Sequence, residues 1–224
     1  MRNLIRNFRS YWLEDASFVT LLIMLITAVF VLPVIMDLSG HGVLLFNILM
    51  LSVFFSGIFS TRSVGLIAVS AILFSIHLTL RLVRFGENPY SFFVLENVIG
   101  IANTLVFIYI NLRLLFRDRI VNAYRIVGAV NVYLLLALMG ALTFEVIHAA
   151  TGVSLGGNVV LSGTDNDYVH FIYFSLASLT TVGFGDIYAV SAPARMLATF
   201  LSTLGVLFPA IVIARLVGLA SSGN

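Results

Sequence analysis

The residues best suited to chemistry form one run near the C-terminal end of the chain, Thr-Thr-Val-Gly-Phe-Gly-Asp at 180–186. Two glycines alternate there with larger residues, and glycine adopts the backbone angles that turn successive carbonyl groups the same way. A row of such carbonyls, facing copies from other subunits, could replace the hydration shell of a potassium ion. The hydroxyl of Thr181 would add one more ring of oxygens at the inner end. The run therefore predicts a site for a monovalent cation that needs no ionised ligand.

The rest of the chain has the composition of a membrane protein. Of its 224 residues, 60% are hydrophobic and 10% are charged, and the mean hydropathy is +1.09. A soluble domain carries about 25% charged residues, so the composition argues against a soluble enzyme or a nucleic-acid-binding protein. The sequence contains no cysteine, which excludes a disulfide framework, a thiolate zinc site and a cysteine nucleophile.

Six apolar stretches are long enough to cross a membrane, which takes about 20 residues each. They are 18–36, 43–61, 63–80, 90–112, 126–144 and 196–214. A seventh stretch, 168–185, is short and ends in the glycine-rich run. Non-helical backbone cannot face lipid but can line a protected cavity. We therefore expect this stretch to enter and leave the membrane on the same side.

The arginines predict the orientation of the spans, because positively charged residues gather in cytoplasmic loops. With six crossings, eight of them fall on one side, namely Arg2, Arg6, Arg9, Arg62, Arg113, Arg117, Arg119 and Arg125. Both termini are then cytoplasmic, and the arginine-free segment 149–167 is external. Arg81 and Arg84 are exceptions that the same count places outside, where Glu96 could pair with one of them.

The first 17 residues predict an amphipathic helix on the cytoplasmic membrane surface. Apolar side chains recur there at helical spacing, and the arginines fall mostly on the other side. A frayed polar terminus is the alternative. The expected domains are 1–17 for this helix, 18–120 for a four-helix transmembrane domain and 121–224 for a domain that holds the cation site.

The segment from 127 to 218 resembles the pore of the potassium-channel family, whose filter reads Thr-Val-Gly-Tyr-Gly or Thr-Val-Gly-Phe-Gly. The resemblance covers an outer helix, a pore helix, the filter and an inner helix, in that order. It implies that K+ binds through filter oxygens of the first four residues. The implied filter residues are Thr181, Val182, Gly183, Phe184 and Gly185.

Three more residues match family positions around the filter. Thr180 matches the residue before the filter, and Asp186 matches the acid just outside it. Glu145 matches an outer-helix glutamate that, in many members, bonds to the backbone near the outer end of the filter. The resemblance therefore implies that these residues support the filter.

Two departures from the family pattern concern the pore helix. Tyr173 and Phe174 stand where many members have paired tryptophans, and Phe184 replaces the filter tyrosine. The pore-helix tryptophans and the filter tyrosine hydroxyl that often bond to each other are thus absent together. Packing is therefore expected to replace hydrogen bonds around this filter. Ala177 stands where some members carry a glutamate that pairs with the acid, so this partnership is expected to be missing and the outer mouth to be held less firmly.

Gly205 matches the glycine hinge of the family's inner helix, and Pro209 lies four residues later. Proline removes the hydrogen bond to the carbonyl at i−4, which here belongs to Gly205. Two interpretations stay open. The pair is either a gating hinge or a fixed kink that only shapes the cavity, and in both cases it is expected to touch only the path below the filter.

Several polar residues fall in or near the predicted external segment. Asp165 and Asp167, with Asp186, are expected to place negative charge around the external mouth. The two loop acids are equally compatible with ordinary loop polarity. His148 and His170 are expected to be solvated loop histidines, with a pH-sensitive outer pore as the alternative.

The sequence thus predicts an all-α membrane protein with six transmembrane helices, a re-entrant pore helix and a selectivity filter. One filter strand per chain cannot surround an ion, so a homotetramer with four-fold symmetry is expected. The expected partners are further copies of the chain, membrane lipid and K+, with no nucleic acid. The expected location is the plasma (inner) membrane of a prokaryote.

The expected function is passive, potassium-selective conduction, with no enzymatic activity and no cofactor besides K+ as the permeant ion. Voltage dependence is expected to be weak or absent, because 90–111 contains none of the arginines of a voltage sensor. The alternative is a potassium-uptake transporter subunit with a pore-like loop. Such proteins resemble four pore repeats in one chain, and this chain has one such loop and no inverted repeat.

Overall fold

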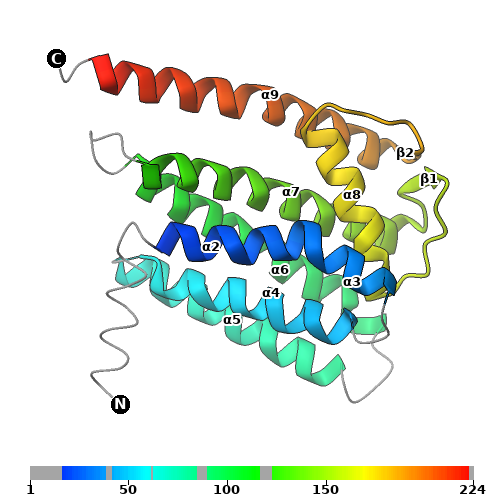
Figure 1. The fold of residues 1–224 in the computed structure, drawn as a ribbon. Coiled ribbons are helices and arrows are strands. Elements are labelled where there is room, and N and C mark those ends of the chain that lie inside the picture. Colours follow the sequence, from blue (N-terminus) through cyan, green and yellow to red (C-terminus); the bar gives the residue numbers. More distant parts are fainter. Residues whose placement is uncertain (1–16, 39–41, 62, 85–89, 117–122, 222–224) are drawn as a thin grey trace.

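The structure is a computed structural model that describes residues 17–38, 42–61, 63–84, 90–116 and 123–221. Long helices run side by side, and two short strands lie at one end of the bundle (Figure 1). We call this the sheet end; α2 begins and α9 ends at the opposite end. The amphipathic helix predicted at 1–17 lies outside the described residues except for Ser17, which begins α2.

Within the described residues, six helices are long and apolar enough to cross a membrane, and they correspond to the six predicted spans. An α-helix satisfies its backbone groups internally, which is what a spanning segment requires in lipid. The first comprises α2 (Ser17–Ile26), η1 (Thr27–Val31) and α3 (Leu32–Leu38), and the others are α4 (Gly42–Phe59), α5 (Val64–Arg84), α6 (Tyr90–Leu115), α7 (Ala123–Thr151) and α9 (Ala192–Ser221).

The first span contains a turn of π-helix, η1, directly before Pro33. In this turn the N–H of Leu32 donates to the carbonyl of Thr27, five residues back. Pro33 has no N–H to continue the regular pattern. The wider turn lets the helix pass the proline and continue to Leu38 as α3.

The chain between α7 and α9 is folded at the sheet end. It contains β1 (Leu155–Gly157), the 3-10 turn η2 (Asp165–Asp167), α8 (Tyr168–Leu179) and β2 (Ile187–Ala189). The strands pair antiparallel, with Gly157 opposite Ile187. The two strands are a small addition to the expected all-helical fold. From its start at the sheet end, α8 runs into the bundle, and the following segment returns to β2 (Figure 1).

Helix α7 is the most enclosed span and α9 the least. In an apolar 18-residue stretch of α7, 72% of the residues are buried, against 11% in the corresponding stretch of α9. Helix α7 packs against α2, α6, α8 and α9. It also continues to Thr151, past the predicted end at 144, because Glu145 is buried in the bundle and does not end the helix.

Arg81 of α5 is buried and neutralised within the protein. Its Nε lies 2.5 Å from Oε1 of Glu96 on α6, and its Nη1 lies 3.5 Å from Oδ2 of Asp165. The guanidinium also donates to the side-chain oxygen of Asn47 on α4. The predicted pairing of Glu96 is confirmed for Arg81, which explains how an arginine is tolerated at this end of the third span.

Candidate functional site

The segment 180–186 has a backbone of alternating hand. The φ angle is 59° at Thr181, 55° at Gly183 and 83° at Gly185, while Val182 and Phe184 are not in the positive-φ region. Alternation between left-handed and right-handed residues turns consecutive peptide groups toward a common side. A β-branched residue such as Thr181 rarely adopts positive φ, and such strain is typical of functional sites. Such a backbone is compatible with a row of carbonyl groups that face one way.

Helix α8 anchors the start of this segment. The N–H of Thr180 donates to the carbonyl of Leu176 at 2.8 Å, and that of Thr181 to Ser178 at 3.1 Å. The N–H of Gly183 reaches back to the carbonyl of Ala177 at 3.3 Å. With 12 residues, α8 is about 18 Å long, too short to cross a hydrocarbon core of about 30 Å. Its C-terminal end carries the negative pole of the helix dipole, which favours a cation nearby.

The far end of the segment is tied to α8 by Tyr173. The hydroxyl of Tyr173 donates to both carboxylate oxygens of Asp186, at 3.0 and 2.8 Å. Its ring stacks on Phe184, with centroids 6.2 Å apart and planes 10° apart. Burial, followed by the hydrogen bond and the charge of Asp186, raises the pKa of Tyr173, so the phenol stays protonated as the donor.

The glutamate partnership is absent, as expected from Ala177, but Tyr173 supplies Asp186 with another partner. The prediction considered only position 177, whereas the partner comes from the aromatic pair. Packing does not replace hydrogen bonding either, since Tyr173 supplies both a stacked ring and a donor. Phe174 points to α7 instead, with its ring 5.0 Å from Phe144 in an edge contact.

Helices α7 and α9 form a socket for α8. Ser175 donates to the carbonyl of Ala137 on α7 at 2.7 Å. On α9, Ser202 donates to the carbonyl of Ser178 at 2.9 Å. The hydroxyl of Tyr133 on α7 donates to the carbonyl of Leu179, the last residue of α8, at 3.1 Å. The last two bonds satisfy carbonyls at the C-terminal turn of α8, and all three hold this helix against α7 and α9.

Sequence reasoning missed these supporting residues. One signal was present: Gly140 lies in the middle of α7, and small residues mark close helix contacts in membranes. A Cβ at Gly140 would lie 2.3 Å from the hydroxyl of Ser175. The hydroxyl donors themselves carry no signal in a single sequence.

Gly205 lies against α8 and not only along a path below the segment. A Cβ at Gly205 would lie 1.6 Å from the carbonyl oxygen of Leu179, so the glycine permits the close approach of α9 to α8. The expectation that Gly205 and Pro209 touch only the path below the filter is wrong in this respect. Helix α9 continues through Pro209 to Ser221. A hinge function for the pair stays a prediction.

Residues 154–158 bond to the chain directly after the 180–186 segment and fix its position. The N–H of Asn158 donates to the carbonyl of Asp186 at 2.9 Å, and the N–H of Val190 donates to Ser154 at 2.9 Å. Gly157 has φ of 105°, and a Cβ there would lie 2.2 Å from the carbonyl oxygen of Asp186. The β1–β2 pairing thus holds the exit of the segment and requires glycine at 157.

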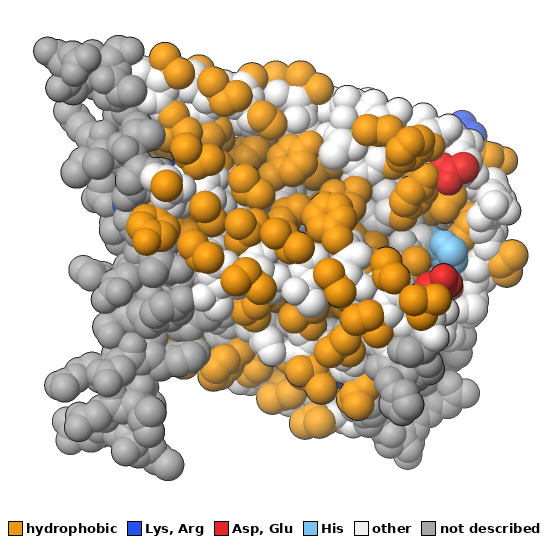
Figure 2. All heavy atoms as spheres, in the orientation of Figure 1, with side chains coloured by type: hydrophobic (Ala, Val, Ile, Leu, Met, Phe, Trp, Pro, Cys, Tyr) orange, Lys and Arg blue, Asp and Glu red, His pale blue; other side chains and the backbone are white. Residues whose placement is uncertain are grey.

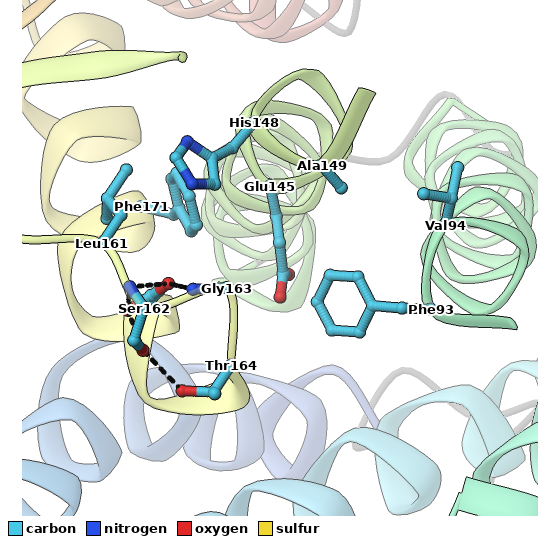
Figure 3. Close-up of a pocket in the computed structure, with 11 residues that line it drawn as sticks. Phe93, Val94, Glu145, His148, Ala149, Leu161, Ser162, Gly163, Thr164 and Phe171 are labelled. Carbon is cyan, nitrogen blue, oxygen red and sulfur yellow. Dashed lines mark hydrogen bonds between the residues drawn. The ribbon is translucent and has the colours of Figure 1, made fainter. Parts of the chain in front are cut away.

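Glu145 lines a cavity of about 270 Å³ at the sheet end. The cavity is bounded by the start of α6, the end of α7, the 161–164 loop and α8. Figure 3 shows Glu145 pointing into the space between Phe93 and the loop at Gly163. No described residue of the 180–190 region lines this cavity, although the family resemblance implies a bond near the outer end of the filter.

Asp165 and Asp167 do not place free charge at the mouth. Asp165 is 8% exposed and is bound to Arg81. Asp167 is 3% exposed, and its carboxylate accepts bonds from the N–H groups of Ser162 and Gly163 and from the Ser162 hydroxyl. Loop position suggested solvent contact, but both acids instead hold the chain that enters α8.

The two histidines lie on helices and not in loops. His148 belongs to α7, where it lines the cavity and its ring lies 6.1 Å from that of Phe171. His170 belongs to the first turn of α8. Within the described part of the chain, no group of three His, Asp or Glu side chains could hold a metal ion.

The part of the chain that contains this site is similar to a known protein family. Residues 132–221 match the model of a family described as ion channel. The matched segment contains most of α7, all of α8, the 180–186 run and α9. A search of the curated proteins gave no match, and neither did a search of the solved structures. The match supports an ion channel family, and with the six long apolar helices it indicates an integral membrane protein.

Proposed function

We propose that the chain is the subunit of a potassium-selective channel that conducts K+ passively. The observation that supports it is the alternating backbone hand at Thr181, Gly183 and Gly185, directly after the C-terminal end of α8. In this proposal, a dehydrated K+ ion is held by the Thr181 hydroxyl and by backbone carbonyls of 181–184. K+ is the permeant ion, and no cofactor takes part.

The proposed channel is a homotetramer. The side chains of the segment face outward from a single chain: Val182 is 54% exposed and Phe184 is 71% exposed. One chain supplies one strand, while a ring of ligands needs several, and four is the number that K+ filters use. Helix α9 also exposes large apolar side chains, among them Phe200, Leu207 and Ile211. Further copies would cover this surface.

In the proposed membrane placement, the sheet end is external and both termini are cytoplasmic. The start of α2 and the end of α9 lie at the same end of the bundle, as an even number of crossings requires (Figure 1). Hydrophobic side chains cover the middle of the face in Figure 2, and its visible acidic and histidine side chains lie at the sheet end. Helix α8 is then re-entrant, and lipid surrounds the helices of the 18–120 and 121–224 domains. The membrane we propose is the inner membrane of a prokaryote.

Two electrostatic features would favour cations at the proposed filter. The C-terminal pole of α8 is directed at its inner end. The exposed Asp186 lies at its outer end, where a negative charge raises the local cation concentration. Neither feature selects K+ over Na+, so selectivity depends on the carbonyl row.

The test is the reversal potential of purified protein in planar bilayers with mixed potassium and sodium. We expect a strong preference for potassium, with block by barium. Gly183→Ala should abolish selective conduction, because a Cβ at φ of 55° strains the backbone even though no atom of the chain lies within 4 Å. Gly65→Ala is the matched control, since Gly65 has open space and no positive φ. A wild-type protein that does not discriminate between the two ions would refute the proposal.

A further inference from the structure

The first residue of α8 is attached to the first span of the same chain. Tyr168 is 1% exposed, and its hydroxyl donates to the carbonyl of Ala28 in η1 at 3.1 Å. Ala28 is completely buried. The Tyr168 ring also lies 4.6 Å from the ring of Phe46 on α4. The N-terminal end of α8 is therefore held by helices that contribute nothing to the 180–186 segment.

Pro33 explains why this carbonyl is open to a side-chain donor. In η1 the N–H of Leu32 bonds to Thr27, five residues back. In the same register, the donor for Ala28 would be the nitrogen of Pro33, which carries no hydrogen. A buried carbonyl without a donor is costly, and buried backbone groups are almost always paired. The Tyr168 hydroxyl supplies the donor that the proline removes.

We propose that Tyr168 is a positioning residue for the filter. The π-helical turn η1, followed by Pro33, supplies the carbonyl of Ala28 as its hydrogen-bond acceptor in the first span. The proposal rests on the proposed channel function. The Tyr168–Ala28 bond fixes the N-terminal end of α8, and thereby the direction in which its C-terminal end presents 180–186. A 12-residue helix is a rod of about 18 Å, so a displacement at one end is transmitted to the other.

A second attachment lies beside the first. Asp165, three residues before Tyr168, is bound to Arg81 of α5 at 3.5 Å. The Arg81 guanidinium lies 5.5 Å from the centroid of the same Phe46 ring that contacts Tyr168. The two attachments share Phe46 and bring α2–α5 to the start of α8. Movement of these peripheral helices is thereby coupled to the orientation of α8.

The chemistry of Tyr168 suits a permanent donor. Burial, followed by the negative charge of Glu145, raises the pKa of the Tyr168 hydroxyl. The phenol therefore keeps its proton throughout the neutral range. A phenylalanine at this position would keep the ring contact with Phe46 and remove only the donor.

The experiment is a double-mutant cycle at the single-channel level. Tyr168→Phe should lower the open probability about fivefold, the net worth of one buried hydrogen bond, with the potassium-to-sodium permeability ratio unchanged. Pro33→Ala restores an N–H at position 33, so Tyr168→Phe combined with Pro33→Ala should recover the wild-type open probability. Tyr109→Phe, at an exposed tyrosine of α6, is the matched control and should change nothing.

The outcomes separate this proposal from the proposed function. An unchanged open probability in Tyr168→Phe, or no recovery in the double variant, overturns the positioning role while selective wild-type currents uphold the channel. If Tyr168→Phe fails to assemble, assembly of the double variant supports the proposal, and its failure to assemble overturns it. Wild-type protein without potassium selectivity overturns the proposed function itself.

Discussion

The two ends of α8 differ in how completely one chain satisfies them. At the N-terminal end, Asp165, Asp167 and Tyr168 are all buried, and each is bonded to another part of the chain. Beyond the C-terminal end, every residue of 180–186 is exposed. The N-terminal end is therefore fully packed within one chain, whereas the 180–186 segment, the proposed filter, is left open by a single chain.

The N-terminal end of α8 contributes to stability, whereas the strained backbone at Thr181 is typical of a functional site. The buried end uses ordinary pairing of charges and hydrogen-bond donors, which any well-folded helical bundle needs. The exposed end keeps a strained residue, Thr181, in a left-handed conformation. Strain of this kind persists only when the surroundings enforce it. Here the surroundings are α8, Tyr173 and the β1–β2 pairing on one side and, in the proposed homotetramer, further copies of the chain on the other.

The largest expected effect comes from breaking the buried end at Arg81. Arg81→Met removes the guanidinium that neutralises the buried carboxylates of Glu96 and Asp165. Loss of one partner from a buried ion pair costs about 3–5 kcal/mol. We expect a sharp loss of thermal stability and of assembled protein, measured by heating followed by size-exclusion chromatography. Arg113→Met, at an exposed arginine of α6, is the control. Equal stability of the two variants would show that the buried end of α8 does not depend on the ion pairs of Arg81.

The next effect concerns the packing of α9 on the C-terminal end of α8. Gly205→Ala places a Cβ within 1.6 Å of the Leu179 carbonyl oxygen, so α9 must shift. Overpacking of this kind costs about 1–3 kcal/mol. We expect a lower melting temperature together with altered selectivity, because the displaced carbonyl lies two residues before the proposed filter. Gly218→Ala on the same helix meets no atom within 4 Å and should behave as wild type.

Gly205→Ala also separates the two interpretations of the inner helix. If the variant keeps its melting temperature and its selectivity and changes only open probability, Gly205 is a hinge and not a packing contact. That result would show that the socket of α8 tolerates movement of α9.

A smaller effect is expected at the outer end of the proposed filter. Tyr173→Phe keeps the stacked ring but removes the donor to Asp186. A hydrogen bond to a charged group is worth about 1.5–3 kcal/mol, and less where water competes. We expect faster decay of the current at constant voltage with selectivity retained. Tyr188→Phe, at an exposed tyrosine of β2, serves as the control.

The same bond predicts the direction of a pH effect. Because the pKa of Tyr173 is raised above 10.0, the hydroxyl donates at every pH up to that value. The contribution of the bond is fully present below the ordinary pKa and is lost only as pH rises through the raised one. Titration of the Tyr173 hydroxyl should therefore cause no change in current decay when the external pH is varied between about 6 and 9. A wild-type change in that range that disappears in Tyr173→Phe would contradict this account.

The smallest expected effect is that of membrane voltage. Arg113 is in the last turn of α6, and Arg81 is held in an ion pair, so neither of these two arginines forms part of a ladder. Each charge that crosses the field contributes about 2.3 kcal/mol per 100 mV, and few mobile charges give a shallow conductance–voltage curve. Arg113→Gln should leave this curve almost unchanged. A steep curve that this variant abolishes would contradict the prediction.

Sequence reasoning located the elements and the segment because both depend on local patterns. Apolar runs of spanning length predicted the six helices, and the alternation of glycine with larger residues predicted the unusual backbone at 181–185. The pairing of Arg81 with Glu96 was predictable because two opposite charges at the same depth of a membrane must find each other.

The missed features depend on side chains that meet from distant parts of the chain. Tyr173 reaches Asp186 from the preceding helix, Gly205 approaches Leu179, and Tyr168 reaches Ala28. A hydroxyl or a glycine in an apolar helix has the same local signature whether it faces lipid or another helix. The burial of Asp165 was missed because a charged residue in a loop is usually in contact with water, so the general rule predicted the wrong surroundings.

The most direct test of the proposed tetrameric filter is a crystal structure of the detergent-purified protein grown in rubidium, with anomalous scattering used to place the ions. Rubidium substitutes for potassium and identifies its sites without assumptions about the protein. We expect four chains around one axis, with rubidium peaks on that axis ringed by the carbonyl oxygens of 181–184. Another stoichiometry, or an axis free of rubidium at the level of Thr181 and Gly183, would contradict it.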